Sequence, residues 1–254
     1  MTGPEGSPKR SKFRALPVRV VKGMFKRSVA VLNDRYRAAA GGQDRPAFYD
    51  IEKTYPCLRL LDENHAVIRE EMEGVLRYKG RIPRYHDLYE VETYISGTID
   101  PDKDWKVFML RSLAGTPEAN QAQCPRTTAL LKKLPNVYQA FFSILDPGKS
   151  VPGHCGTYLG YLRYHLGLRV PRNNPPSMRV KDQIHTWEEG RSIVFDDSLE
   201  HEVYNKSDDL RVVLIVDLLR PMPFHLHACN WTLTRMVRHS EEAKQSMARL
   251  KKFS

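Results

Sequence analysis

The feature that most constrains the fold is the texture of the chain after Pro135, where short apolar runs rich in β-branched residues alternate with turn signals. The runs cover residues 137–145, 161–170, 192–195 and 211–219. Sequences rich in Pro, Gly, Asn and Asp separate them, at residues 147–148, 152–153, 173–177, 189–190 and 205–209. Short strands with turn-rich connections predict a mainly β domain, a jelly roll or β-sandwich with flanking helices.

Helical patterns lie on both sides of this strand-rich region. Residues 62–77 are predicted to form a helix with Asp62 as its N-cap, residues 125–133 a second short helix, and residues 240–254 a third. We therefore divide the 254 residues into a basic N-terminal arm with an amphipathic helix and linker (1–47), a helical leader packed on the core (48–134), the strand-rich core (135–230) and a basic C-terminal helical tail (231–254).

The formal net charge of +10 is concentrated in the N-terminal arm. Residues 1–40 contain ten Lys or Arg residues against only Glu5 and Asp34, so little excess charge is left for the rest of the chain. No platform of interleaved aromatic and basic residues accompanies the arm, which disfavours nucleic-acid binding. The excess positive charge therefore belongs to the arm and not to the domain that follows it.

Residues 17–40 of the arm have helical spacing, with Val21, Phe25, Leu32 and Tyr36 on one face and most basic residues off it. The helix is expected to end at Gly41-Gly42. Four interpretations stay open: the helix packs on the domain with a solvated polar face, it makes peripheral contact with an anionic membrane, it belongs to a transit peptide, or it binds an acidic partner. Deleting residues 1–40 is expected to remove membrane association and leave turnover intact.

Cysteine content and hydropathy bound the cellular location. The four cysteines are scattered, without a C-x-x-C pair, which favours a reducing compartment over a disulfide or zinc framework. No apolar run approaches the roughly 18 residues that a membrane span needs. We predict a cytoplasmic protein, peripheral to a membrane if the arm binds lipid.

Two of the nine histidines stand out in the strand-rich region. His154 follows Pro152-Gly153 in a turn before the second run, and His201 lies before the run that begins at Arg211. Two loop-borne imidazoles that each lead into a strand suit a metal site at the open end of a jelly roll. Spacing alone makes this a weak signal.

Six sequence blocks and one arginine resemble the aspartyl/asparaginyl β-hydroxylase family. They are Phe-Ser-Ile-Leu-Asp-Pro-Gly (142–148), His-Cys-Gly (154–156), Leu-Arg-Tyr-His-Leu-Gly-Leu (162–168), Thr-Trp-Glu-Glu-Gly-Arg (186–191), Phe-Asp-Asp-Ser (195–198), Glu-His-Glu-Val (200–203) and Arg211. The likeness covers roughly residues 135–221 and extends loosely back to residue 49. The chain also resembles the lipid A-type acyl-chain hydroxylases of the same family.

The resemblance implies a double-stranded β-helix (jelly roll, cupin-like) catalytic core that uses Fe(II) with 2-oxoglutarate and O2 as cosubstrates. It implies iron binding by His154 and His201, and pairing of Arg211 with the distal carboxylate of 2-oxoglutarate, for which the planar fork of arginine is suited. Ser143 would bond the same carboxylate, and Arg163 and His165 would contact the cosubstrate. Without the resemblance, the last three are ordinary polar core residues.

Two positions depart from the family pattern. Most related iron oxygenases carry an acid two residues after the first histidine, and here that position is Gly156. Aspartyl members carry an arginine two residues before the position of Arg163, where it binds the substrate carboxylate, and here that position is Tyr161. Tyr161 is interpreted as an aromatic rim that suits a long apolar substrate, and Asp197 as a turn cap or a support for a ligand.

These residues predict hydroxylation of an unactivated C–H bond, with release of succinate and CO2. An Asp or Asn side chain, in a peptide or free amino acid, is the first substrate hypothesis, a membrane-lipid acyl chain the second, and another small molecule the third. A different class of function is a catalytically silent jelly-roll binding module.

Overall fold

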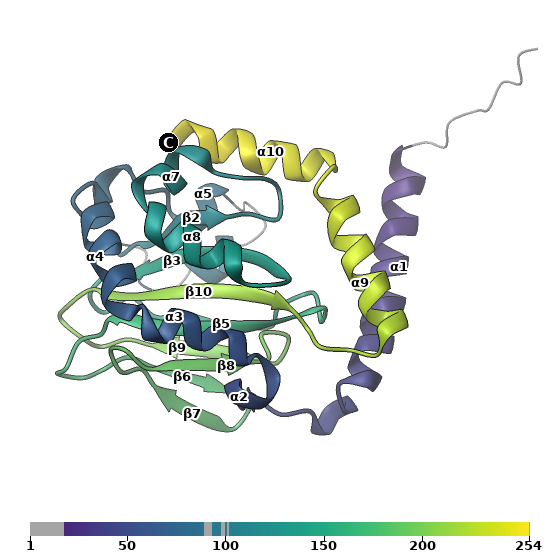
Figure 1. The fold of residues 1–254 in the computed structure, drawn as a ribbon, viewed down its shortest axis with the longest axis horizontal. Helices are drawn as coiled ribbons and strands as arrows, with labels where there is room; N and C mark the ends of the chain where they lie inside the picture. The colour runs from purple at the N-terminus through teal and green to yellow at the C-terminus, as the bar shows by residue number, and fades with distance from the viewer. Residues whose placement is uncertain (1–17, 89–92, 98–99, 101, 254) are drawn as a thin grey trace, which may run out of the picture.

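The computed structural model describes residues 18–88, 93–97, 100 and 102–253, and its centre consists of two antiparallel β-sheets (Figure 1). The strand order is β1-β8-β5-β10-β3-β2 in the six-stranded sheet and β4-β9-β6-β7 in the four-stranded sheet. The strands are β1 (Phe48–Tyr49), β2 (Trp105–Arg111), β3 (Val137–Leu145), β4 (Val151–His154), β5 (Tyr161–Arg169), β6 (Ser177–Val180), β7 (Gln183–Thr186), β8 (Ser192–Phe195), β9 (His201–Tyr204) and β10 (Arg211–Leu219). From β3 to β10 the chain passes back and forth between the two sheets, with β6 and β7 forming a hairpin within the four-stranded sheet. This is the jelly-roll arrangement of a double-stranded β-helix and confirms the predicted fold class.

Strand β10 shows how the sequence places the site. All nine of its residues are buried, because both faces of the six-stranded sheet are covered, and this explains its continuous apolar run. Its even-numbered residues pack in the hydrophobic core on the helix side of the sheet, whereas Val213 and Ile215 pack in the core between the two sheets. The period of two therefore turns Arg211 and Asp217 toward the space between the sheets.

The neighbouring strands obey the same alternation. In β5 the residues Leu162, Tyr164, Leu166 and Leu168 belong to the helix-side core, so Arg163 and His165 face the other sheet. In β3 the flanking residues Phe141 and Leu145 pack between the sheets, on the face that also carries Ser143. The polar residues predicted for the site thus converge on one interior surface.

Helices cover the outer face of the six-stranded sheet and continue along one side of the molecule (Figure 1). The α-helices are α1 (Val18–Ala39), α2 (Ile51–Thr54), α3 (Arg59–Glu63), α4 (His65–Leu76), α5 (Tyr85–Leu88), α6 (Thr93–Gly97), α7 (Glu118–Gln123), α8 (Pro125–Lys133), α9 (Phe224–Val237) and α10 (Glu241–Leu250). Short 3-10 helices are η1 (Gly42–Asp44), η2 (Pro56–Leu58), η3 (Lys79–Arg81) and η5 (Lys251–Phe253). Residues of α3, α4 and α8 form the helix-side core with β3, β5 and β10.

The predicted helix over residues 62–77 is wrong in its start. The segment contains the end of α3 and the whole of α4, and α4 begins after Asn64. Asp62 lies inside α3 and does not cap α4, because its carboxylate accepts hydrogen bonds from Tyr164 Oη (2.6 Å) and Arg59 Nη1 (2.8 Å). The predicted helix over residues 125–133 is confirmed as α8.

Two predicted boundaries also change. Residues 48–134 are more than a helical leader, because β1 and β2 form the two edges of the six-stranded sheet. The boundary at residue 230 falls inside α9, so the C-terminal helical region begins at Phe224. The predicted helix beyond residue 240 is α10, with Ser240 as its N-cap, and Ser254 lies outside the described residues.

Helix α1 matches the predicted helix over residues 17–40, and it ends where Gly41 and Gly42 adopt positive φ angles of 104° and 65°. Its C-terminal half is docked: Tyr36 is fully buried and packs edge-on against Tyr158. Figure 1 shows α1 beside α9. Within the described residues, no helix is both long enough and apolar enough to span a membrane.

Candidate functional site

His154 and His201 are brought together by strand pairing. They lie opposite each other as Cα partners of β4 and β9, with ring centroids 4.1 Å apart. Both are therefore strand residues and not loop residues, which corrects the sequence interpretation. The extended run 137–145 and its partners were visible in the sequence, but β4 and β9 are four residues each and carry too few apolar residues to stand out.

The hydrogen bonds of the two imidazoles fix their tautomers. Nδ1 of His154 lies 2.8 Å from Pro152 O, and Nδ1 of His201 lies 2.8 Å from Leu199 O. A carbonyl oxygen only accepts, so each Nδ1 carries the hydrogen and each Nε2 keeps its lone pair. Burial, with a contribution from His201, lowers the pKa of His154 to about 4, so that this ring is a neutral potential ligand at pH 7.

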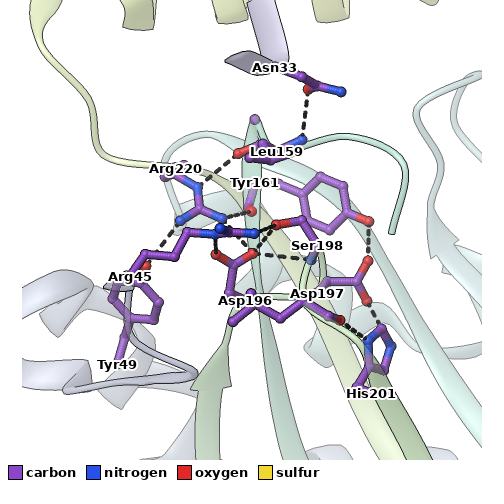
Figure 2. Close-up of polar contacts among 12 residues, drawn as sticks. Asn33, Arg45, Tyr49, Leu159, Tyr161, Asp196, Asp197, Ser198, His201 and Arg220 are labelled. Atoms are coloured by element: carbon purple, nitrogen blue, oxygen red, sulfur yellow. Dashed lines mark hydrogen bonds and ion pairs between the residues drawn. The ribbon is translucent and has the colours of Figure 1, made fainter. Parts of the chain in front are cut away.

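Asp197 lies beside this histidine pair. Its Oδ1 is 3.5 Å from His201 Nε2, and its Oδ2 accepts a hydrogen bond of 2.5 Å from Tyr161 Oη (Figure 2). Arg163 Nη1 forms an ion pair with the same carboxylate. Burial opposes ionisation of Asp197, but the charge of Arg163 and the hydrogen bond from Tyr161 outweigh it and lower the pKa of the carboxyl.

Gly156 leaves the space that Asp197 fills. A Cβ atom at position 156 would lie 2.1 Å from Asp197 Oδ2, and the Gly156 N–H donates to Asp197 O at 2.8 Å. Tyr161 is buried, and its hydroxyl faces Asp197, so it is not the rim residue that the sequence suggested. Asp197 therefore lies beside the histidine pair and Tyr161 is bonded to it, whereas the sequence predicted a supporting carboxylate and a rim residue.

Arg163 holds two buried carboxylates. Besides Asp197, it pairs with Asp217 through Nε (2.7 Å) and Nη2 (2.9 Å), and Gln139 bonds Asp217 from the other side at 2.8 Å. Every part of its guanidinium group is therefore engaged. Arg163 borders the predicted cosubstrate region, but its contacts position Asp197 rather than leave a free donor.

Arg211 is buried without a carboxylate partner among the residues that the structure describes. Its Nη1 lies 3.4 Å from Ser143 Oγ, its Nε has no hydrogen-bond partner, and its guanidinium stacks 4.0 Å from the Trp187 ring centroid. Trp105 Nε1 donates to the same Ser143 hydroxyl at 3.0 Å. Burial lowers the pKa of Arg211 to about 9. An uncompensated buried cation of this kind creates a strong demand for an anionic ligand.

His165 adds two further unpartnered nitrogens. It is buried, and neither ring nitrogen has a hydrogen-bond partner within the described structure. Its ring packs against Phe195 and Trp187 at centroid distances of 5.0 and 5.8 Å. Burial and the positive charge of Arg211 lower the pKa of His165 well below its usual range, so the ring is neutral.

All six residues predicted for the site line one narrow cavity between the sheets: Ser143, His154, Arg163, His165, His201 and Arg211. Its other walls are largely apolar, with Val151, Met178 and Ile215 among them. Across the described part of the chain, no group of three His, Cys, Asp or Glu side chains is arranged as a ready metal site. The protein donors that the cavity offers are thus two imidazoles, with the Asp197 carboxylate nearby.

The loop between β4 and β5, residues 155–160, is held by two helices. Asn33 of α1 donates to Thr157 O (2.9 Å) and accepts from Leu159 N (3.0 Å), as Figure 2 shows for Leu159. Asn230 of α9 donates to Gly160 O (2.6 Å) and accepts from Tyr158 Oη (2.6 Å). Because His154 ends β4 and Tyr161 begins β5, both helices brace the backbone on which the site is built.

Asp196 anchors the turn that carries Asp197. Its carboxylate pairs with Arg45 Nε (2.9 Å) and Arg220 Nη2 (2.7 Å), and Arg220 Nε donates to Leu159 O at 2.8 Å (Figure 2). All three charged side chains are buried. This network is not predictable from the sequence, because only Asp196 belongs to a recognisable motif and the two arginines come from distant segments.

Comparison with known proteins finds similarity over most of the chain. The sequence profile of the family described as Aspartyl/Asparaginyl beta-hydroxylase matches residues 62–221. An ornithine lipid ester-linked acyl 2-hydroxylase from Rhizobium tropici is 38% identical over 193 residues, which cover 76% of this chain and 67% of that protein. A human aspartyl/asparaginyl beta-hydroxylase is 33% identical over 171 residues, covering 65% of this chain but only 21% of the human protein.

The solved structures that resemble this chain include cupin domains. A Cupin_2 domain of an XRE family transcriptional regulator from Enterobacter cloacae aligns with a TM-score of 0.28 and 14% identity, over 33% of this chain and 82% of that one. A Cupin 2 conserved barrel domain protein from Salinispora arenicola aligns with a TM-score of 0.27 and 14% identity, over 37% and 70%.

Proposed function

Because this chain belongs to the aspartyl/asparaginyl beta-hydroxylase family, we propose that it is an Fe(II)- and 2-oxoglutarate-dependent dioxygenase that hydroxylates an unactivated C–H bond. The observation that carries the proposal is a cavity containing two facing imidazoles and, on a strand of the other sheet, a buried arginine without a counter-ion in the described structure. The first is a donor set for a transition metal, and the second is a binding group for a carboxylate.

His154 and His201 would hold the iron through Nε2. The backbone carbonyls that accept from both Nδ1 atoms fix each ring and raise its basicity, an arrangement common to histidine metal ligands. The Asp197 carboxylate is close enough to orient a water molecule at the same centre. These residues fit a metal that keeps open positions for other ligands.

Arg211 and Ser143 would bind the distal carboxylate of 2-oxoglutarate. A bound carboxylate would give Arg211 the counter-ion that it lacks and would satisfy its free Nε. His165, with two unpartnered nitrogens beside Arg211, would contact the same cosubstrate. Arg163 would act indirectly, by holding Asp197 and Asp217 in place.

When bound, the iron would activate O2, of which one oxygen atom would enter succinate as 2-oxoglutarate loses CO2 and the other would enter the C–H bond. The chain's own contribution is positioning and exclusion of water. Apolar walls such as Val151, Met178 and Ile215 keep the cavity dry on the side facing the four-stranded sheet. The buried Tyr161, Asp197 and Arg163 network fixes the polar side.

We place a membrane-lipid acyl chain first among the substrates and an Asp or Asn side chain second. In aspartyl relatives an arginine at position 161 binds the substrate carboxylate, whereas here Tyr161 is buried and its hydroxyl is bonded to Asp197. The similarity to an ornithine lipid ester-linked acyl 2-hydroxylase supports this order. Peripheral contact of residues 17–40 with an anionic membrane fits a lipid substrate and belongs to the same proposal.

The test is succinate formation by protein loaded anaerobically with Fe(II), with and without Asp-containing peptides and membrane lipids. Wild type should form succinate and a hydroxylated acyl chain, whereas His154→Ala and Arg211→Ala should lose turnover. Arg172→Gln, an exposed change outside the cavity, is the control. A peptide product in place of a lipid product would reverse the substrate order. Iron and 2-oxoglutarate binding without turnover would identify a catalytically silent binding module.

A further inference from the structure

Three arginines line a pocket of about 370 Å³ where the end of β2 meets α9. Arg111 is the last residue of β2, Arg235 lies in the last turn of α9, and Arg238 is the C-cap of that helix. Tyr138, Trp231 and His239 line the same pocket. We refer to it below as the arginine pocket.

The arginine pocket carries positive charge without an internal counter-ion. No acidic residue is among its lining residues, and none of the three arginines forms an ion pair with any carboxylate that the structure describes. Glu118 borders a neighbouring cavity that shares Arg111 and Arg238, and it too makes no described ion pair with them. Several other arginines are paired with carboxylates, as Arg126 is with Glu70 and Glu71.

Two contacts show that these charges are held close together. Partial burial and the positive charge of Arg238 both lower the pKa of Arg111, so the two guanidinium groups repel each other. The guanidinium of Arg235 stacks 3.8 Å from the centroid of the Trp231 ring, which limits its freedom to move into solvent. The fold therefore brings the guanidinium groups of three exposed arginines to one pocket, where a bound anion could neutralise their charge.

The arginine pocket is connected to the histidine pair through two stacked tyrosines. Tyr138 in the pocket stacks on Tyr161, with ring centroids 5.4 Å apart and planes at 13°. Tyr161 in turn bonds Asp197, which lies beside His201. Leu219 also lines the pocket and pairs with Tyr161 across β10 and β5. Two tyrosine rings thus separate an anion-binding environment from the histidine pair.

We propose that the arginine pocket binds the anionic head group of the substrate, a phosphate or carboxylate, while the remainder of the substrate extends past Tyr138 toward the cavity. Guanidinium groups bind both anions through paired N–H donors, and three of them give selectivity against neutral head groups. This inference rests on the proposed function in one respect: it takes the bound anion to be part of the molecule that is hydroxylated.

The experiment measures binding and turnover separately on the full-length protein. Titrations with inorganic phosphate and with dihexanoyl phosphatidylglycerol are followed by the Nε–Hε NMR signals of the arginines. The test variant is Arg111→Gln/Arg238→Gln, and the matched control is Arg77→Gln/Arg172→Gln, which removes the same charge from exposed arginines outside the pocket.

Both ligands should shift the signals of Arg111, Arg235 and Arg238, and the test variant should bind each at least about tenfold more weakly than wild type and control, as expected for lost charge-assisted hydrogen bonds. Its KM for an anionic lipid substrate should rise with little change in the KM for 2-oxoglutarate. Equal binding of phosphate by the test variant and wild type would overturn the anion site. Phosphate binding without competition by the lipid would overturn the head-group assignment. If the protein binds phosphate but shows no turnover on any substrate, the anion site stands and the proposed function fails.

Discussion

The carboxylate of Asp197 occupies the space into which a side chain at position 156 would project, since a Cβ on Gly156 would lie 2.1 Å from Asp197 Oδ2. The same oxygen accepts the hydroxyl of Tyr161. The two positions at which this chain departs from the family pattern, 156 and 161, therefore meet at one carboxylate. Both departures are explained together, because the acid near the histidines comes from the turn before β9 and not from the loop after β4.

Substitution of Gly156 should destabilise the protein through this contact. Gly156→Ala forces its Cβ against Asp197, and overpacking of a buried site typically costs about 1–3 kcal/mol. In Gly156→Ala/Asp197→Ala the clash is absent, so the two effects on the free energy of unfolding should be strongly non-additive. Chemical denaturation of the four proteins measures the coupling. Additive effects would mean that the loop moves away at no cost.

Asp197 and Tyr161 should control metal affinity without being predicted ligands. Removing a residue that supports metal ligands typically lowers affinity by about 10–100-fold. Asp197→Asn should therefore weaken Mn(II) binding strongly, and Tyr161→Phe should weaken it less, because Arg163 still holds the carboxylate. Calorimetric titration of the apoprotein measures both. Tyr138→Phe, which keeps the ring stacked on Tyr161, is the control.

Arg211 should limit the stability of the protein without cosubstrate. Its buried charge has no carboxylate partner in the described structure, so Arg211→Met should raise the free energy of unfolding of the apoprotein by about 1–3 kcal/mol. The same change should abolish the increase in Tm that 2-oxoglutarate gives to wild type. Thermal unfolding with and without 2-oxoglutarate tests both effects. A destabilised variant that still responds to 2-oxoglutarate would contradict the assigned role.

The sequence predicts the long strands well and the short ones poorly. Strands β3 and β10 are nine-residue apolar runs buried on both faces, so their hydrophobicity alone identifies them. Strand β7 has three of its four residues exposed, and β4 begins Val-Pro-Gly. Such strands form because the jelly roll pairs them with β6 and β9, and that pairing is not encoded within four residues.

The site residues were predictable because the resemblance names them, and alternation along β3, β5 and β10 explains why they converge. What supports them was not predictable. Arg45 and Arg220 contact Asp196 from segments about 150 and 24 residues away, and no local sequence pattern predicts a contact over such a separation. The relation between Gly156 and Asp197 is likewise a packing fact, visible only once two turns are placed side by side.

Glu71 should make the helical layer sensitive to acid. Burial alone would raise the pKa of Glu71, but hydrogen bonds from Thr127 and Arg126 at the start of α8 outweigh it and lower the pKa. A lowered folded-state pKa contributes stability that is fully present above about pH 4.3 and is lost as the pH falls through the folded value. Glu71→Gln should cost about 1–3 kcal/mol at pH 7 and progressively less in acid. Denaturation at several pH values measures this, with the exposed Glu70→Gln as control.

Helix α1 should contribute to catalysis through Asn33 and to membrane contact through residues before 28. Because Asn33 binds both Thr157 O and Leu159 N, Asn33→Ala should loosen the loop after His154 and lower kcat about tenfold, while vesicle binding stays unchanged.

Truncation of residues 1–27 should instead abolish binding to anionic vesicles and preserve turnover on a soluble short-chain substrate. Deletion of residues 1–40 removes Asn33 and Tyr36 as well, so it should damage both properties, contrary to the expectation from sequence. Asp34→Ala, an exposed change on the same helix, is the control. Loss of turnover in the 1–27 truncation would show that the basic segment, and not Asn33, supports the site.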